Sequence, residues 1–193
     1  MVRRAALLAV IAVLLSTSSV LAATSTVKMY NNYFSPKTQT ITIGNSVKWR
    51  NVSTKRHDAT PTVNWSWGGV SVAAGATSPV VTPTQAGSFA YFCSLHATMK
   101  GTVKVRMQVS PAAGTTGTYF LLTLGTVTTP GVLVHQVEAR LNGGAWQLRA
   151  TTAAPQTSLL FTTAGTWDLR TRLRYQLGGQ TSGYSPLSTI QVF

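Results

Sequence analysis

Apolar and polar residues alternate along most of this chain, and beyond the first 22 residues no segment longer than a turn or two has a helical period. Alternation places every second side chain on one face of a strand, so the pattern predicts an all-β protein. Segment 47–51 is one example, with Val47, Trp49 and Asn51 on one face. The longest example is segment 168–177, which places Leu169, Thr171, Leu173, Tyr175 and Leu177 opposite Asp168, Arg170, Arg172 and Arg174. We interpret this arginine row as the solvent-facing side of a half-buried strand, with a binding role as the alternative.

A run of small, polar, proline and glycine residues at 110–117 interrupts the strand patterns and is typical of a linker. The chain therefore divides into a β-sandwich domain at 23–109 and a second one at 118–193.

The first 22 residues have the pattern of a secretory signal peptide. Arg3 and Arg4 precede an apolar run over residues 5–15, and small residues follow at 20–22. This apolar run is shorter than the roughly 20 residues that span a bilayer, so we expect no permanent membrane span. A secreted protein, periplasmic or on the exterior of the cell envelope, is predicted.

Composition limits the chemistry that this chain can perform. Three acidic residues against 16 Lys and Arg leave a net charge of +13, so a site built from several carboxylates is nearly excluded. A single cysteine excludes an internal disulfide framework. The positive charge favours an acidic protein partner or an anionic cell-surface polymer, or serves only to keep the surface solvated. No nucleic-acid recognition motif is present.

One cluster of residues carries metal chemistry. Cys93, His96 and Met99 follow one another at intervals of three between two predicted strands, and His57 ends a strand pattern that a neighbouring strand can bring to the same point. Two imidazoles, one thiolate and one weak thioether form the ligand set of a blue-copper electron-transfer site. Each of these residues, taken alone, also fits a purely structural role in place of metal ligation, since buried Cys and Met often only fill space in a core.

The segment around these residues resembles the plastocyanin/azurin family of cupredoxins, and the Cys-x2-His-x2-Met spacing is most similar to its amicyanin-like branch with a short ligand loop. The resemblance covers residues 24–108. It implies a Greek-key β-sandwich with one type 1 copper ion, His57, Cys93 and His96 as equatorial ligands and Met99 as the axial ligand. It also implies that electrons pass through the edge of His96, near Leu95.

Two positions depart from the family pattern. Asp58 replaces the usual asparagine after the first histidine, and its carboxylate accepts hydrogen bonds but does not donate them. Ala97 replaces a common proline, which leaves the loop less rigid. Both changes concern the tuning of the site rather than its ligands.

The last 75 residues or so resemble a fibronectin type III-like domain, with Gly165–Arg170, Gly178-Gly179 and Ser182–Pro186 preceding a final strand at 190–192. The resemblance implies an immunoglobulin-like sandwich that serves as a spacer or adhesion module.

These observations predict a secreted one-electron carrier that docks an acidic redox partner near His96 and is not an enzyme. The alternative is a copper-binding or delivery protein, or a cell-surface adhesion module. A copper enzyme needs ligands for a second ion, and the spare histidine, His135, fits a core or interface position better.

Lys55 and Arg56 are expected to raise the reduction potential slightly. Asn51 and Asn64 match the glycosylation pattern, and we expect Trp65 and Trp67 to pack under a loop.

Overall fold

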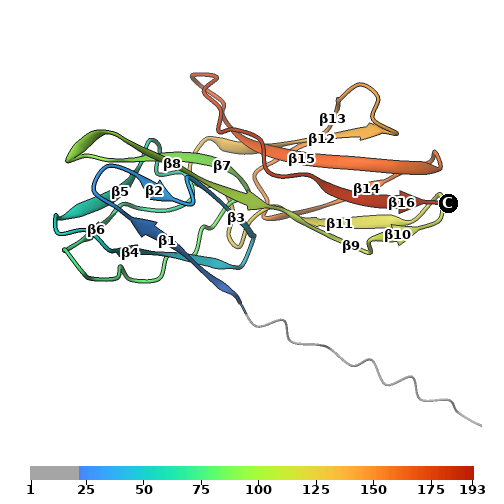
Figure 1. Cartoon of the computed structure of the whole chain (residues 1–193). Helices are drawn as coiled ribbons and strands as arrows, with labels where there is room; N and C mark the ends of the chain where they lie inside the picture. Colours follow the sequence, from blue (N-terminus) through green and yellow to red (C-terminus); the bar gives the residue numbers. More distant parts are fainter. Residues whose placement is uncertain (1–21) are drawn as a thin grey trace, which may run out of the picture.

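The structure is a computed structural model that describes residues 22–193, and its regular elements are all strands (Figure 1). The first half of the chain forms two sheets. The smaller has the order β2-β1-β4, and the larger has the order β3-β8-β7-β5-β6. The bounds are β1 (Thr24–Met29), β2 (Phe34–Ser35), β3 (Thr38–Thr42), β4 (Ser46–Asn51), β5 (His57–Pro61), β6 (Val70–Val72), β7 (Gly87–Cys93) and β8 (His96–Arg106).

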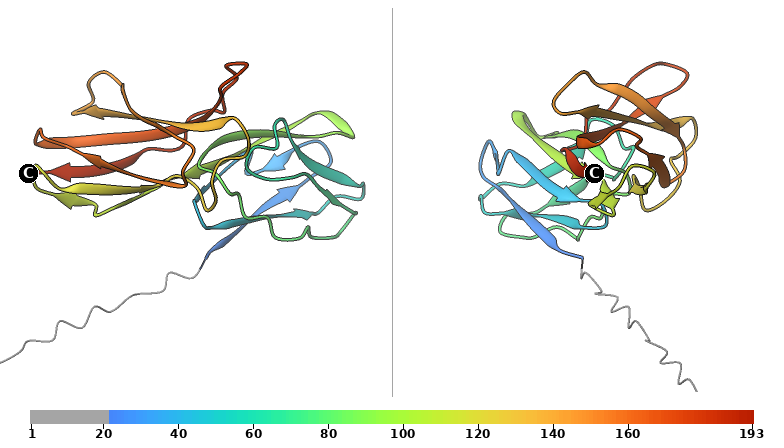
Figure 2. Two further views of the ribbon diagram at one scale, coloured as in Figure 1. Left: turned by 180° about the vertical axis from the view of Figure 1, so that it is seen from behind. Right: turned by 90° about the vertical axis from the view of Figure 1, so that its right-hand side faces the viewer.

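The second half also forms two sheets, with the orders β10-β16-β15-β12-β13 and β14-β11-β9. Its strands are β9 (Gln108–Ser110), β10 (Ala113–Gly114), β11 (Tyr119–Thr123), β12 (Leu133–Leu141), β13 (Gln147–Thr152), β14 (Gln156–Leu160), β15 (Gly165–Tyr175) and β16 (Ser188–Val192). The two halves lie end to end, with the β7–β8 turn at one end of the molecule and the C-terminus at the other (Figures 1 and 2). The predicted all-β sandwich fold is confirmed.

Burial follows the alternation in the sequence. Val47, Trp49 and Asn51 of β4 are fully buried, whereas Arg50 between them is exposed. Leu169, Thr171 and Leu173 of β15 are also fully buried. Leu177 is 78% exposed and does not share their face, because β15 ends at Tyr175 and the chain turns at the two glycines that follow.

The segment expected as a linker, residues 110–117, carries regular structure. It contains the end of β9 and all of β10, which pairs with β16 in parallel. The predicted signal peptide, residues 1–22, lies outside the described residues apart from Ala22. Within residues 22–193, no helix is long and apolar enough to cross a membrane.

Backbone and side-chain hydrogen bonds join the two halves. The amide of Ala86 donates to Leu124 O at 2.7 Å. His135 is fully buried and its Nε2 lies 2.9 Å from Oε1 of Gln85, which is also fully buried. Burial lowers the pKa of His135 to about 4 and keeps the imidazole neutral. His135 is therefore an interface residue, as the sequence predicted.

A short segment, Ser182–Ser185, connects β15 with the strand that carries Cys93. On one side its amides donate to Leu173 O and Thr171 O at 2.9 and 2.8 Å. On the other side, Gly183 and Ser88 exchange two backbone hydrogen bonds at 2.9 and 3.0 Å. Because Ser88 belongs to β7, the second half extends directly onto the sheet of the first half that contains Cys93.

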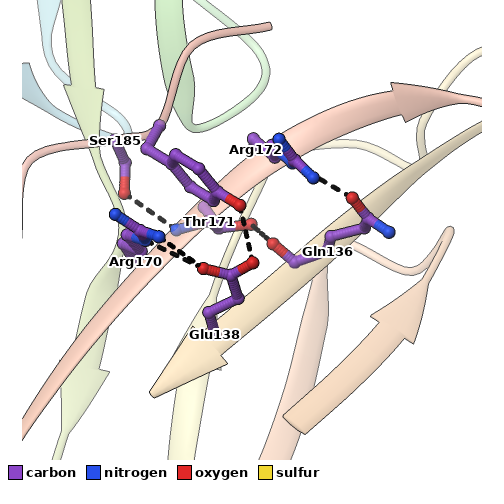
Figure 3. Close-up of polar contacts among 7 residues, drawn as sticks. Gln136, Glu138, Arg170, Thr171, Arg172 and Ser185 are labelled. Atoms are coloured by element: carbon purple, nitrogen blue, oxygen red, sulfur yellow. Dashed lines mark hydrogen bonds and ion pairs between the residues drawn. The ribbon is translucent and has the colours of Figure 1, made fainter. Parts of the chain in front are cut away.

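The arginine row of β15 is part of a stack with aromatic rings. The Arg170 guanidinium lies 4.0 Å from the ring centroid of Trp146 and 3.7 Å from that of Tyr184. Arg170 also pairs with Glu138 at 2.7 Å, and Arg172 bonds Gln136 at 3.0 Å (Figure 3). Burial would raise the pKa of Glu138, but hydrogen bonds from Tyr184 and Arg170 outweigh it and hold this pKa below its usual value. The row is thus half-buried and largely engaged with its own neighbours.

Candidate metal centre

Strands β7 and β8 form a tight hairpin that presents two of the predicted ligands. Cys93 ends β7 and His96 begins β8, so the two residues pair across a turn made of Ser94 and Leu95. The register shifts between Phe92 and Cys93, which marks a bulge at the ligand position. The Cys93 sulfur lies 3.4 Å from Nδ1 of His96.

The third predicted ligand comes from β5, which pairs with β7 through Thr60 and Phe92. His57 begins β5, and its Nδ1 lies 3.7 Å from the Cys93 sulfur. The ligand atoms of His57, Cys93 and His96 all lie within 4.8 Å of one another. The convergence of these three side chains, predicted from residues distant in sequence, is thus present in the structure.

Burial differs among the three residues. His57 and Cys93 are fully buried, while His96 is partly exposed. The cluster is therefore shielded from solvent at His57 and Cys93, and it reaches the surface only at the imidazole of His96.

Met99 lies three residues beyond His96 on β8 and is fully buried, between the exposed residues Thr98 and Lys100. Its side chain therefore faces the interior of the first half. Its role as the axial ligand stays a prediction.

A hydrogen bond at Nε2, the ring nitrogen that does not face Cys93, orients the imidazole of His57. Its Nε2 lies 2.9 Å from the hydroxyl of Ser53, which also bonds Asn51 Oδ1 and Lys55 O. A hydrogen bond from Nε2–H to this hydroxyl leaves Nδ1 as the unprotonated nitrogen that faces Cys93. The sequence singled out Ser53 only as the third residue of the glycosylation pattern at Asn51, and not as a partner of His57.

Asn51 fixes the loop that carries Ser53. Its side-chain amide donates to Lys55 O at 2.8 Å and to Val72 O at 3.0 Å, and its oxygen accepts from the Ser53 amide. Since Asn51 is fully buried, it is not available as a glycan acceptor, and this reading of its sequence motif is wrong. The asparagine instead braces the turn before His57.

Asp58 connects the histidine strand to the cysteine turn. Its backbone amide donates to the Cys93 sulfur at 3.4 Å, and its carboxylate accepts from the Ser94 amide at 2.8 Å. The Ser94 and Thr60 hydroxyls also donate to it. The carboxylate acts purely as an acceptor, which is the behaviour expected from the replacement of asparagine at this position.

The electrostatics of the site favour metal ligation over proton binding. Burial lowers the pKa of His57, and the neighbouring His96 and Lys55 lower it further, while Asp58 acts in the opposite direction. A neutral imidazole is the form that coordinates a metal ion.

The donor set fits copper. Two imidazole nitrogens and one sulfur form a compact trigonal group, with an amide hydrogen bond on the sulfur and a hydroxyl behind one histidine. Soft sulfur and borderline nitrogen donors in this arrangement suit both oxidation states of copper.

The remaining aromatic candidates have packing roles. Trp67 is almost fully buried and stacks on Trp49 with ring centroids 5.1 Å apart. Trp65 is partly buried against the same core. His135, at the junction of the two halves, does not belong to the ligand cluster.

Several solved structures resemble parts of this chain. A reduced amicyanin mutant is 20% identical, covers 44% of this chain and 82% of its own length, and has a TM-score of 0.39. A second reduced amicyanin mutant is 18% identical over 46% of this chain and 87% of its own, with a TM-score of 0.40. A purple cupredoxin from Nitrosopumilus maritimus is 21% identical over 42% of this chain and 98% of its own, with a TM-score of 0.37.

No protein-family model matches the sequence, and no curated protein matches it. At these identities and TM-scores, the assignment of the site rests on its own geometry.

Proposed function

We propose that this protein is a type 1 copper protein that carries single electrons outside the cytoplasm, and that it is not an enzyme. The observation that carries the proposal is the convergence of His57, Cys93 and His96 on one point, with their ligand atoms within 4.8 Å. One bound copper ion would supply the redox chemistry by alternating between Cu(II) and Cu(I).

The protein's own residues fit this role. Ser53, Asn51 and Asp58 hold the proposed ligands through protein hydrogen bonds, so the ligand geometry would change little when the charge of the copper ion changes. Met99 would complete the set as a weak axial ligand. His96 is the partly exposed ligand, and Leu95 beside it is 56% exposed, so electrons would pass through this edge to a transiently docked partner.

The second half would serve as a rigid extension of the carrier, and its similarity to a fibronectin type III-like module stays a prediction. It docks onto β7 through Gly183 and onto Gln85 through His135, which supports a fixed spacing between the copper centre and the C-terminus. An anionic cell-surface polymer remains the proposed contact for this basic protein.

The experiment that tests the proposal compares electron exchange with copper exchange. In a carrier, self-exchange between the Cu(I) and Cu(II) forms is fast on the NMR timescale, and the ion is retained against a chelator. A copper-delivery protein gives the reverse: slow self-exchange and rapid loss of copper. That second outcome would overturn the proposal.

A further inference from the structure

A groove opens beside the metal centre, on the side of β5 and β6. Its walls include Arg56, Asp58, Thr60, Ser71, Ser94 and Leu95. Two of these, Ser94 and Leu95, form the turn that joins Cys93 to His96. A group bound in the groove therefore contacts the turn between two of the ligands.

Arg56 is positioned to bind a group in this groove. Its Nε donates to the Ser71 hydroxyl at 2.9 Å, which fixes the guanidinium against β6. Both ion pairs within residues 22–193 lie in the second half, at Arg140 and Arg170, so no described carboxylate pairs with Arg56. The terminal nitrogens keep their capacity for a bidentate contact.

The one carboxylate in the groove wall is already engaged. Asp58 is only 8% exposed, and both of its oxygens accept hydrogen bonds from Ser94 or Thr60. These hydrogen bonds stabilise the carboxylate but leave its charge in place, so the attraction for an acidic group comes from the guanidinium of Arg56 and from the charge around the groove. Residues 23–110 carry nine Lys and Arg against this single acid, a net charge of 9 − 1 = +8, so the surrounding field has the same sign as the guanidinium.

We propose that this groove receives an acidic side chain of the protein redox partner, and that Arg56 is the residue that anchors it. The inference rests on the proposed function and names the chemistry of its docking site. A carboxylate paired with the guanidinium would lie against the hydroxyls of Ser71 and Thr60, while the exposed Leu95 supplies apolar contact at the rim. The partner would thus be held beside His96.

The first test uses small redox reagents with the copper-loaded full chain. Iron(II)–EDTA presents carboxylates and is an anion, whereas hexaammineruthenium(II) is a cation, and each gives one electron to Cu(II). Arg56→Gln should slow reduction by iron(II)–EDTA about three- to tenfold at low salt, with the effect shrinking at high salt. A change in reduction potential alters both rates in the same direction, so a change in the ratio of the two rates reports the local effect of the Arg56 charge and not the potential.

Arg106→Gln is the matched control, because Arg106 is an exposed arginine at the far end of β8. It should change the ratio of rates much less than Arg56→Gln does. Equal effects of the two substitutions would overturn the docking proposal while leaving the electron-carrier function intact. If neither reagent reduces the loaded protein, the proposed function fails, and the docking proposal fails with it.

A second test measures binding without electron transfer. Titration of the Cu(I) protein with hexaglutamate should shift the amide NMR signals of Ser71, Ser94 and Leu95, and Arg56→Gln should abolish these shifts while Arg106→Gln retains them. Shifts spread evenly over the lysine-bearing surface, or unchanged in the Arg56 variant, would contradict the proposal.

Discussion

The carboxylate of Asp58 accepts two hydrogen bonds from Ser94, one from its backbone amide and one from its hydroxyl. Ser94 follows Cys93, and the amide of Asp58 in turn donates to the Cys93 sulfur. Each of these residues is the neighbour of a proposed ligand. Together they hold the start of β5 against the end of β7, so the ligand geometry is set by protein contacts.

Replacing Asp58 with Asn should raise the reduction potential of the copper-loaded protein. The substitution removes a negative charge that stabilises Cu(II), and an effect of about 50 mV follows for a charge several ångströms away in a partly buried site. Voltammetry measures it. Asp168→Asn is the control, since Asp168 pairs with Arg140 in the second half and should leave the potential unchanged. A lower or unchanged potential in the Asp58 variant would contradict this account.

Removing the hydroxyl of Ser53 should weaken copper binding. Ser53→Ala deletes the hydrogen bond that orients His57, and the loss of such a partner typically lowers metal affinity by about 10-fold or more. Competition with a chelator of known affinity measures the copper affinity of each variant. Ser71→Ala is a suitable comparison, because Ser71 bonds Arg56 and no ligand. The role assigned to Ser53 fails if the two variants bind copper equally well.

The buried His135 should make stability depend on pH. Its pKa is about 4 in the folded protein against an ordinary value of 6.5, so below pH 6.5 the unfolded chain binds a proton that the folded protein resists. The free energy of unfolding should therefore fall as the pH drops from 6.5 to 4, by up to about 3 kcal/mol.

Urea unfolding at several pH values tests this effect in the wild type and in His135→Gln. The glutamine does not titrate, so the difference between the two proteins isolates His135 from His57, whose pKa is also lowered. Stability curves that run parallel with pH would exclude His135 as the cause.

The stack around Arg170 should contribute measurably to stability. Tyr184→Phe removes the hydrogen bond of 2.6 Å to Glu138 and keeps the ring, so it should cost about 1–2 kcal/mol. Tyr184→Leu also removes the cation–π contact and should cost about 1 kcal/mol more. Thermal or urea unfolding distinguishes the two steps. Two equally stable variants would mean that the ring contributes nothing beyond its bulk.

The sequence was sufficient to predict the convergence of His57, Cys93 and His96, because cysteine and histidine are rare in this chain and two of these residues are three positions apart. One cysteine with His96 three residues later leaves few arrangements for a β-sandwich, although His57 begins β5 instead of ending the strand pattern at 47–51. Alternation also predicted the buried faces of β4 and β15, since burial on one side of a sheet imposes a period of two.

Contacts between distant loops could not be predicted from the sequence. Ser53 is an ordinary polar residue until the turn before His57 brings its hydroxyl to the imidazole, and the side chain of Asn51 braces that turn. The strand at 113–114 forms because β16 offers a free edge, which local composition does not reveal. Trp146 and Tyr184 reach Arg170 from separate loops, so the pattern of β15 alone shows an arginine row but not the rings that pack against it.

The most direct test of the copper assignment is the absorption spectrum of the purified protein with one equivalent of Cu(II), compared with that of Cys93→Ser. We predict an intense blue band from charge transfer between the Cys93 thiolate and copper, which disappears in the serine variant. A colourless wild-type protein, or a band that survives the loss of the thiol, would contradict the assignment.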